Sequence, residues 1–431
     1  MTIYDYQEAF GAADKTGKAM RQAMENWKNL YYGAAADGSD PCQRLAYTIV
    51  TKLCKAAFGE YRAMSSESGV QAVLEALDRV RQRAFATALV EGECYLKPYP
   101  GAESFSFEVV PGSNVLIFSQ DGAGEPTDVG LVETSIRNAD YFTLLERRTL
   151  DEKGFLTISY KLFKSKDSEK LGQQVKLAEN PLYGDLPDCY TYPERVDSVG
   201  LVRVKLPVVN CVDGSNRGVS VFAAAADLIG NIDENEHQLR GEFSRGESRI
   251  IASKDMLSEG ALKDHLFVGL DEDPETVGIT VFSPQLRVEA FLARKQEYLR
   301  NVESIVGLRR GMLSDANVEE RTATEIASST ADFNLTVLEL QGMWQAAVSD
   351  CVKLCGILSK IYQLPPVEGD FQLDWGNGIL YDEAAQWAEY LEMVKAGILK
   401  PEVALGWRFG MAADTPQQQS AVREKYMPQS N

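Results

Sequence analysis

The segment Arg309-Arg310-Gly311-Met312-Leu313-Ser314-Asp315-Ala316-Asn317-Val318-Glu319-Glu320-Arg321 decides how this chain is interpreted, because it separates two long helical patterns. On its N-terminal side, Ser283 suits an N-cap, and Pro284 suits the first helical position, where its missing N–H costs nothing. A helix is therefore expected from about Pro284 to Leu308, with Gly307 as its stop signal. Lys295 interrupts its apolar face once. That face comprises Val288, Phe291, Leu292, Tyr298, Leu299, Val302, Ile305 and Val306.

On its C-terminal side, the segment leads into a second and longer helical pattern, which continues to about Tyr362. Thr322 and Glu325 have the spacing of a capping box, in which each side chain satisfies a backbone donor of the first turn. At about 1.5 Å per residue this helix would be ~60 Å long. Helices average only ~11–12 residues, so we expect this one to form a wall or a stalk. Its apolar stripe comprises Phe333, Val337, Leu340, Trp344, Ala347, Val348, Cys351, Cys355, Leu358 and Ile361.

The composition limits the classes of protein to which the chain can belong. With 431 residues, it can bury more than one core. A formal net charge of −19 argues against a tight, sequence-reading DNA-binding protein, because such proteins need basic surfaces that neutralise phosphates. No uninterrupted apolar run reaches about 18 residues, so we expect no membrane span. Asp5 and Glu8 argue against an N-terminal targeting signal.

The cysteines are expected to be reduced thiols that pack as small core residues. They are odd in number and lie mostly within apolar runs, which favours synthesis in a reducing cytosol. The seven residues are Cys42, Cys54, Cys94, Cys189, Cys211, Cys351 and Cys355.

The N-terminal half of the chain predicts helices followed by strands. Residues 1–92 are expected to be mostly helical, with helices at Tyr4 to Trp27, Leu45 to Tyr61 and Val70 to Val90. From Cys94 to Pro207 the apolar period changes to two, and turn signals separate the runs, which indicates strands. Within this region, Lys164 to Asn180 predicts either a charged linker or a long hairpin.

The C-terminal half predicts mostly helices. One is expected from Ser220 to about Gly246, followed by a small unit of strands with a short helix near Glu259 to His265. Pro365-Pro366 should end the long helix, and Phe371 to Trp375 predicts a strand that can rejoin the sheet of the N-terminal half. The remaining expectations are helices at Tyr381 to Ala396 and from Lys400-Pro401, and a Gln-rich end, Thr415 to Asn431, that frays.

Motifs in and around the opening segment resemble those of the portal proteins of tailed bacteriophages. The closest similarity is to the group found in long-tailed phages and prophages of Gram-positive bacteria. The motifs are Pro284-Gln285-Leu286-Arg287, Ile305-Val306-Gly307-Leu308-Arg309-Arg310-Gly311-Met312-Leu313-Ser314-Asp315 and Thr322-Ala323-Thr324-Glu325-Ile326. In that family the Thr-Ala-Thr-Glu run follows the loop that projects into the DNA channel. Weaker similarity involves Leu30-Tyr31-Tyr32-Gly33, Gly218-Val219-Ser220-Val221-Phe222 and Val394-Lys395-Ala396-Gly397-Ile398-Leu399.

The resemblance implies an α+β, portal-type, multi-lobed fold with a wing, a two-helix stem, a small α/β clip, a long helix and a short crown. The wing would be residues 1–217, with helices followed by mostly antiparallel strands. The other expected segments are the first stem helix 218–247, the clip 248–283, the second stem helix 284–308, the channel (tunnel) loop 309–321, the long wing and channel helix 322–362, the wing strand 363–380 and the C-terminal helical crown 381–431.

The same resemblance implies a structural channel and not an enzyme, with no cofactor and no metal. About twelve copies would form a homo-oligomeric ring at one capsid vertex of the virion, after assembly in the cytoplasm of the bacterial host. Double-stranded DNA would pass through it without sequence specificity during packaging and ejection. The other expected partners are the terminase large subunit, a head-tail adaptor, and the major capsid and scaffolding proteins, with no membrane.

The implied site residues fall into groups. Those of the channel loop that would face DNA are Arg309, Arg310, Met312, Leu313, Ser314 and Asn317. Thr322 and Glu325 would cap the helix after the loop, and the clip residues expected to dock the motor or the adaptor are Asp271, Glu272, Asp273 and Glu275. The two arginines have a second interpretation, as cations that offset the negative end of a helix dipole, and Glu319 and Glu320 in the same loop favour it. Acidic residues along the two stem helices would repel DNA within a few Debye lengths of ~8 Å and so centre it.

Other sites and functions are weaker alternatives. Gly11 to Lys18 is similar to a phosphate-binding loop, but its spacing is one residue too long and Ala19 replaces the required Ser or Thr. His237 and His265 lie in different segments, and Cys351 and Cys355 are expected to be buried apolar residues rather than zinc ligands. An acidic-cleft hydrolase is another alternative, although the sequence nominates no pair of carboxylates for its catalytic site. Another phage structural component, such as a minor capsid or adaptor protein, also stays open.

Overall fold

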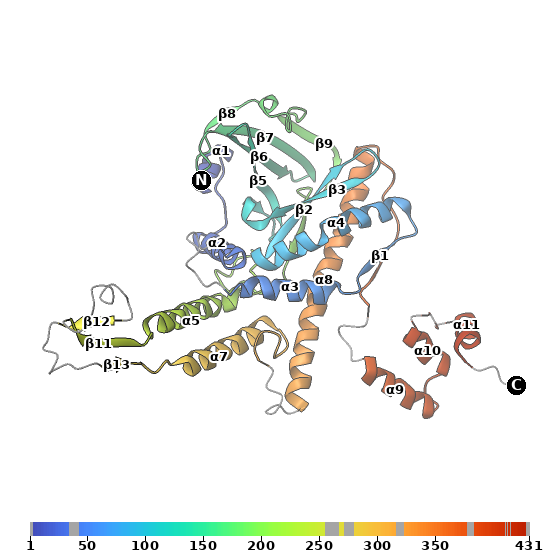
Figure 1. Cartoon of the computed structure of the whole chain (residues 1–431). Helices are drawn as coiled ribbons and strands as arrows, with labels where there is room; N and C mark the ends of the chain where they lie inside the picture. Colours follow the sequence, from blue (N-terminus) through green and yellow to red (C-terminus); the bar gives the residue numbers. More distant parts are fainter. Residues whose placement is uncertain are drawn as a thin grey trace. The chain divides into compact units, whose positions relative to one another are not determined.

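The structure, a computed structural model, describes residues 3–33, 43–254, 267–270, 280–315, 323–376, 383–409, 411, 413 and 415–427. The chain divides into two compact units, the first comprising Met1–Lys55 with Ala63–Gln372 and the second Ala56–Arg62 with Leu373–Asn431 (Figure 1). Its mixture of helices and strands agrees with the predicted α+β class. In the described part of the chain, no helix is both long enough and apolar enough to cross a membrane.

Helices dominate the first 92 residues: α1 (Ile3–Phe10), α2 (Lys18–Tyr32), α3 (Leu45–Phe58) and α4 (Ser68–Glu91), with the short strand β1 (Arg62–Met64) before α4. The expectation of one helix from Tyr4 to Trp27 is wrong. The chain leaves the helical path between α1 and α2 because it bonds to a strand. The amide of Lys15 donates to the carbonyl of Ile117 at 2.8 Å, and the amide of Ile117 donates to Asp14 Oδ1 at 3.0 Å.

Antiparallel strands follow: β2 (Glu93–Pro100), β3 (Phe105–Pro111), β4 (Val115–Gln120), β5 (Pro126–Arg137), β6 (Asp140–Leu150), β7 (Phe155–Ser165), β8 (Gln173–Val175), β9 (Cys189–Arg195) and β10 (Val202–Lys205). One sheet has the order β10-β2-β3. The other runs β4-β5-β6-β7-β8, and β9 also pairs with β7. The stretch from Lys164 to Asn180 begins in β7 and returns along it in β8, so the hairpin alternative is confirmed.

One part of the core of the first unit lies where two helices pack on the smaller sheet, and further clusters of buried apolar residues lie on the larger sheet. The helix α8 (Ala323–Ile361) contacts β2, β10 and α4, and α4 contacts β2 and β3. Phe85 of α4 and Trp344 of α8 are fully buried, with their rings edge-on at 6.4 Å. The predicted stripe of α8 therefore faces this core, since all its members but Ile361 are buried.

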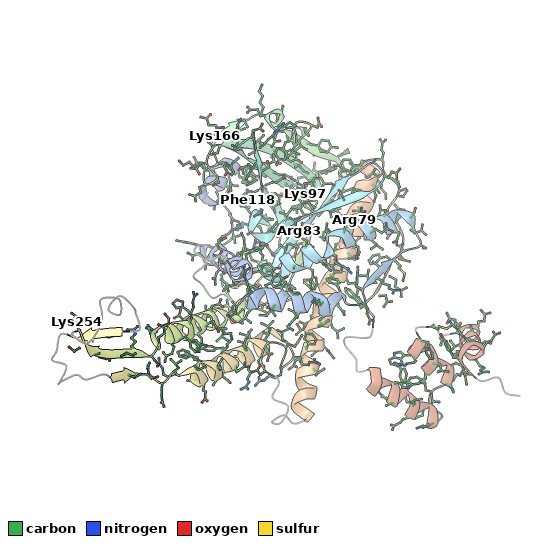
Figure 2. All side chains as sticks on the ribbon, in the orientation of Figure 1. Arg79, Arg83, Lys97, Phe118, Lys166 and Lys254 are labelled. Atoms are coloured by element: carbon green, nitrogen blue, oxygen red, sulfur yellow. The ribbon has the colours of Figure 1, made fainter. Side chains whose placement is uncertain are left out.

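Buried ion pairs connect the strands to the segment that precedes the next helix. Glu93 is fully buried and pairs with Arg203 at 2.5 Å and with Arg217 at 3.0 Å. Gly92 adopts a φ of 84°, and a Cβ there would lie 2.2 Å from the backbone of Gly218, so the close approach requires glycine. A second cluster joins the two sheets, because Lys97 on β2 (labelled in Figure 2) binds Glu146 on β6 at 2.5 Å.

Two antiparallel helices, α5 (Ala226–Arg245) and α7 (Val288–Val306), lie side by side in the same unit (Figure 1). The expected start of the first helix at Ser220 is wrong. Ser220 Oγ donates to the carbonyl of Leu89 at 3.0 Å, and the amide of Val221 donates to the same carbonyl. These bonds hold the chain against the end of α4, so α5 begins only after the short turn of helix at Ala223–Ala225.

The predicted helix from Pro284 to Leu308 is confirmed, with a later start. Arg287 precedes the first residue of α7 and makes no side-chain cap. Ser283, predicted as the N-cap, instead shares a hydrogen bond between hydroxyl groups with Ser248 at 3.0 Å. Between α5 and α7 the chain forms the strands β11 (Arg249–Ser253), β12 (Phe267–Leu270) and β13 (Thr280–Phe282), in the order β12-β11-β13. The short helix expected near Glu259 to His265 lies outside the described residues.

The second unit contains α9 (Glu383–Lys395), α10 (Pro401–Phe409) and α11 (Pro416–Tyr426). The strand expected at Phe371 to Trp375 is present as β14 (Gln372–Asp374), but it pairs with β1 and not with either sheet of the N-terminal half. Much of the Gln-rich end, which was expected to fray, forms the helix α11. Its Thr415 and Gln418 form a capping box with bonds of 3.0 and 3.3 Å.

Candidate functional site

The loop after α7 starts at a position that strongly favours glycine. Gly307 adopts a φ of 75°, and its amide donates to the carbonyl of Glu303, which ends the helix as predicted. A Cβ at this position would lie 2.3 Å from Thr336 Oγ1 on α8. Glycine therefore serves two needs, a left-handed backbone and close packing of the end of α7 against α8.

Glu303 holds the first half of the loop in place. Its side chain is fully buried, and one carboxylate oxygen accepts the amides of Gly311 at 3.0 Å, Leu313 at 2.5 Å and Ser314 at 2.8 Å. The other oxygen accepts Ser314 Oγ at 2.8 Å. Hydrogen bonds to a charged acceptor are about twice as strong as neutral ones. The carboxylate therefore fixes a turn of backbone that has no regular partner.

A second side chain on α7 extends this anchor. Gln296 Oε1 accepts the amide of Asp315 at 2.8 Å. Within the segment itself, the amide of Met312 donates to the carbonyl of Arg309 at 3.1 Å. Two polar side chains of α7 and one internal turn thus define the path of the chain up to Asp315.

The structure brings together several residues predicted for the channel loop. Arg309 and Arg310 are exposed, Met312 and Leu313 are half-buried, and Ser314 is buried against Glu303. The exposed guanidinium groups thus leave from the start of the loop, while the middle of the segment is tied to α7.

Other predicted site residues lie outside the described part of the structure. They are Asn317 and Thr322, the side chain of Glu325, and the clip residues Asp271, Glu272, Asp273 and Glu275. The roles expected of them in the loop, the cap and the clip stay predictions.

The acidic faces expected on the two helices are partly neutralised by neighbouring basic residues. Lys295, the interruption in the stripe of α7, binds Glu236 of α5 at 3.0 Å. Glu242 of α5 pairs with Arg287 at 2.8 Å, and this pairing lowers the pKa of Glu242. Asp227 and Glu234 of α5 remain exposed.

The other candidate sites have structural explanations within the described residues. In the segment from Gly11 to Lys18, Asp14 occupies the turn and binds Arg21 at 2.7 Å, so a carboxylate lies where a phosphate-binding loop needs an anion. No group of three or more His, Cys, Asp or Glu side chains in the described ranges could hold a metal ion.

The cysteine prediction is confirmed in part. Cys94, Cys351 and Cys355 are buried, and burial raises the pKa of Cys351 well above its ordinary value. Cys189 and Cys211 are exposed, so the expectation that they pack as core residues is wrong; both lie in segments that face solvent. Cys42 lies outside the described residues.

Sequence reasoning missed Glu303 and Gln296. The apolar periodicity predicts a buried stripe on α7 that includes Ile305, but Ile305 is 46% exposed, whereas Glu303 is fully buried. The signal was present, because residue 303 lies four positions after the buried Leu299, on the same helix face. A carboxylate on a core-facing position, followed by a glycine-containing loop, indicates an acceptor for free backbone amides.

No protein-family model matches this sequence, and a search of curated proteins finds no match either.

Proposed function

We propose that this chain is a portal-type subunit that assembles into a ring around a channel for double-stranded DNA. The loop after α7 lines that channel, and the segment from β11 to β13 lies at the end where a packaging motor or a tail adaptor docks. The ring belongs to the capsid vertex of a phage particle and carries no catalytic site.

The observation that carries this proposal is the loop anchored by Glu303 between α7 and the 39-residue helix α8. Arg309 and Arg310 directly precede the anchored residues and are exposed. A loop that contacts a moving polymer needs a fixed base, because the tip of the loop must move with the polymer while the loop as a whole stays in place. Non-specific contacts between arginine and phosphate suit such a loop, since they hold the backbone without reading bases.

A further observation supports assembly with neighbouring copies. Leu335 and Leu338 of α8 are 59% and 49% exposed, and Ile305 at the end of α7 is 46% exposed. Burying such side chains is favourable by about 25 cal/mol per Å² of apolar surface. Identical copies related by a rotation that closes would cover them with heterologous contacts.

Native mass spectrometry and negative-stain microscopy of the purified protein test the proposal. We expect closed rings of about a dozen copies with a central hole. A stable monomer at micromolar concentration would contradict the proposal, and so would an assembly without a central hole. Hydrolytic turnover by a monomer would favour the enzyme alternative instead.

A further inference from the structure

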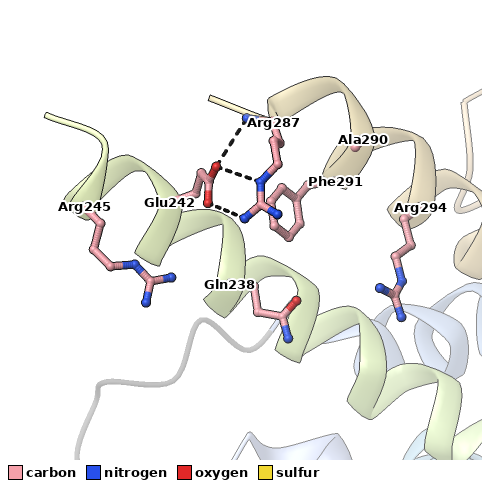
Figure 3. Close-up of a pocket in the computed structure, with 7 residues that line it drawn as sticks. All are labelled: Gln238, Glu242, Arg245, Arg287, Ala290, Phe291 and Arg294. Carbon is pink, nitrogen blue, oxygen red and sulfur yellow. Dashed lines mark hydrogen bonds and ion pairs between the residues drawn. The ribbon is translucent and has the colours of Figure 1, made fainter. Parts of the chain in front are cut away.

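A pocket with an unusual charge lies between α5 and α7, at the end of these helices nearest to β11. Its volume is about 380 Å³, and Figure 3 shows the side chains around it. Gln238, Glu242 and Arg245 line it from α5. Arg287, Ala290, Phe291 and Arg294 line it from α7 and the residue before it. We refer to these seven residues as the arginine pocket.

The arginine pocket carries a local excess of positive charge in a chain whose net charge is −19. Glu242 neutralises one of its three arginines, because it binds the Arg287 guanidinium through two hydrogen bonds of 3.0 and 2.8 Å. Within the part of the chain that the structure describes, Arg294 donates hydrogen bonds to the neutral hydroxyl of Tyr298 alone, at 2.8 and 2.7 Å. Among the described residues, Arg245 makes neither a hydrogen bond nor an ion pair, although its charge helps to lower the pKa of Glu242 after the larger effect of Arg287. Within the described ranges, two of the three guanidinium groups therefore form no ion pair with a carboxylate.

The arrangement of these groups suits an acidic peptide. In Figure 3 Arg245 and Arg294 extend from the two helices toward the same side, with Gln238 between them. The Gln238 amide donates to Glu234 at 2.9 Å, which leaves its oxygen to accept a peptide N–H. Arg287 lies 5.7 Å from the centre of the Phe291 ring, and this ring offers an apolar surface. Arginine is the residue that binds carboxylates in a planar, bidentate manner.

The same features disfavour a nucleic acid. Binding to a phosphate backbone needs an extended basic surface, and the charge of the whole chain has the opposite sign. A carboxylate, by contrast, already occupies one arginine of the pocket in the form of Glu242.

We propose that the arginine pocket binds an acidic segment of a partner protein. One carboxylate of the segment pairs with Arg245 and a second pairs with Arg294, while an aromatic or aliphatic side chain between them packs on Phe291. This inference goes beyond the proposed function, since it names a binding site and its ligand chemistry, and it holds for a single subunit as well as for a ring.

A dye-labelled peptide, fluorescein-Glu-Phe-Glu-Asp-amide, tests the proposal by fluorescence anisotropy with the full-length protein. We expect saturable binding that weakens about tenfold or more in the double variant Arg245→Ala/Arg294→Ala, because each arginine contributes a charged hydrogen bond. Arg294→Lys should give an intermediate affinity, since lysine keeps the charge but loses the planar fork. Arg83→Ala, which removes an exposed arginine of α4 (Figure 2), should leave binding unchanged.

The remaining outcomes would overturn the proposal. In the first, the wild type does not bind the peptide. In the second, the wild type and the double variant bind it equally well. In the third, the wild type binds a neutral Gln-Phe-Gln-Asn peptide as tightly as the acidic one. Binding of inorganic phosphate or of a short oligonucleotide that displaces the peptide at lower concentration would point to a phosphate site instead. If the wild type binds no peptide and the double variant loses self-association, the pocket is a contact with a second copy of the chain. Ring formation is measured separately by native mass, so failure of the ring and failure of this pocket are distinguishable.

Discussion

At the scale of single residues, Glu303 determines where the loop after α7 begins. Its carboxylate accepts three backbone amides and one hydroxyl from Gly311 to Ser314. A buried amide that loses its acceptor loses the protection that a hydrogen bond gives against exchange with water. We expect Glu303→Ala to speed hydrogen exchange of residues 309–315 by roughly 10- to 100-fold, as measured by mass spectrometry. Glu303→Gln should have a smaller effect, because one amide oxygen can still accept.

Glu289 provides the matched control for this experiment. It lies on the same helix and is exposed, so Glu289→Ala should leave exchange in the loop unchanged. Unchanged exchange of the loop in Glu303→Ala, with α7 intact by circular dichroism, would show that the carboxylate does not hold the loop.

At the scale of elements, α8 presents an apolar face that the described residues of its own unit leave exposed. Leu335 and Leu338 are exposed there, and Gly342 continues the same face with open space beside it. We expect Leu335→Glu/Leu338→Glu to abolish ring formation in native mass spectra. The stability of the subunit should change little, since exposed substitutions usually alter the free energy of unfolding by no more than about 0.5 kcal/mol each.

The control for α8 is Leu182→Glu, which places the same charge on another exposed leucine, at 74% exposure, in the turn before β9. Rings should form normally in this variant. If the α8 double variant also forms rings of normal mass, this face of α8 is not an interface between copies.

The same scale shows how far the sequence predicts the structure. The positions of α7 and α8 follow from their apolar periodicity, because a buried stripe records which side of a helix meets the core. The break between α1 and α2 and the late start of α5 could not be predicted. They depend on bonds to Ile117 and Leu89, which are distant in sequence. The motif predicts where the loop lies but not what anchors it, since the role of Glu303 depends on donors eight to eleven residues later.

At the scale of the whole first unit, buried carboxylates connect the sheets with the base of α5. Burial alone would raise the pKa of Glu93, but Arg217 and Arg203 outweigh burial, so its pKa lies below the ordinary value. The pKa of Glu146 is lowered in the same way by Arg148 and Lys97 against the effect of burial. Burial dominates at Glu91, whose pKa is raised. The pKa shifts of these neighbouring carboxyl groups therefore have opposite signs. Acid removes the stabilisation that the charged forms of Glu93 and Glu146 provide, whereas it produces the neutral form of Glu91 that the folded state favours.

The whole-molecule prediction uses this contrast. A carboxylate with a lowered pKa in the folded state stabilises the protein above its unfolded pKa of about 4.3, and this contribution is lost as the pH falls through the folded value. Glu93→Gln leaves Arg203 and Arg217 buried without their charge partner, so near pH 7 it should lower the free energy of unfolding by roughly 3–5 kcal/mol. The difference from the wild type should shrink as the pH falls below about 4, as urea denaturation would measure.

Glu91→Gln makes the same chemical change two residues earlier. Comparing the two variants separates the effect of losing the Glu93 charge from the effect of placing an amide in the packed interior. Because the pKa of Glu91 is raised, its neutral form is the one that the folded state favours. Its oxygen also accepts the amide of Ser113 at 2.7 Å, a bond that glutamine can still make. Glu91→Gln should therefore cost far less than Glu93→Gln at pH 7, and any advantage that it has there over the wild type should disappear as the pH falls, because the wild-type carboxyl then becomes neutral as well. Equal losses in the two variants would mean that the Glu93 charge does not hold β2, β10 and the segment before α5 together.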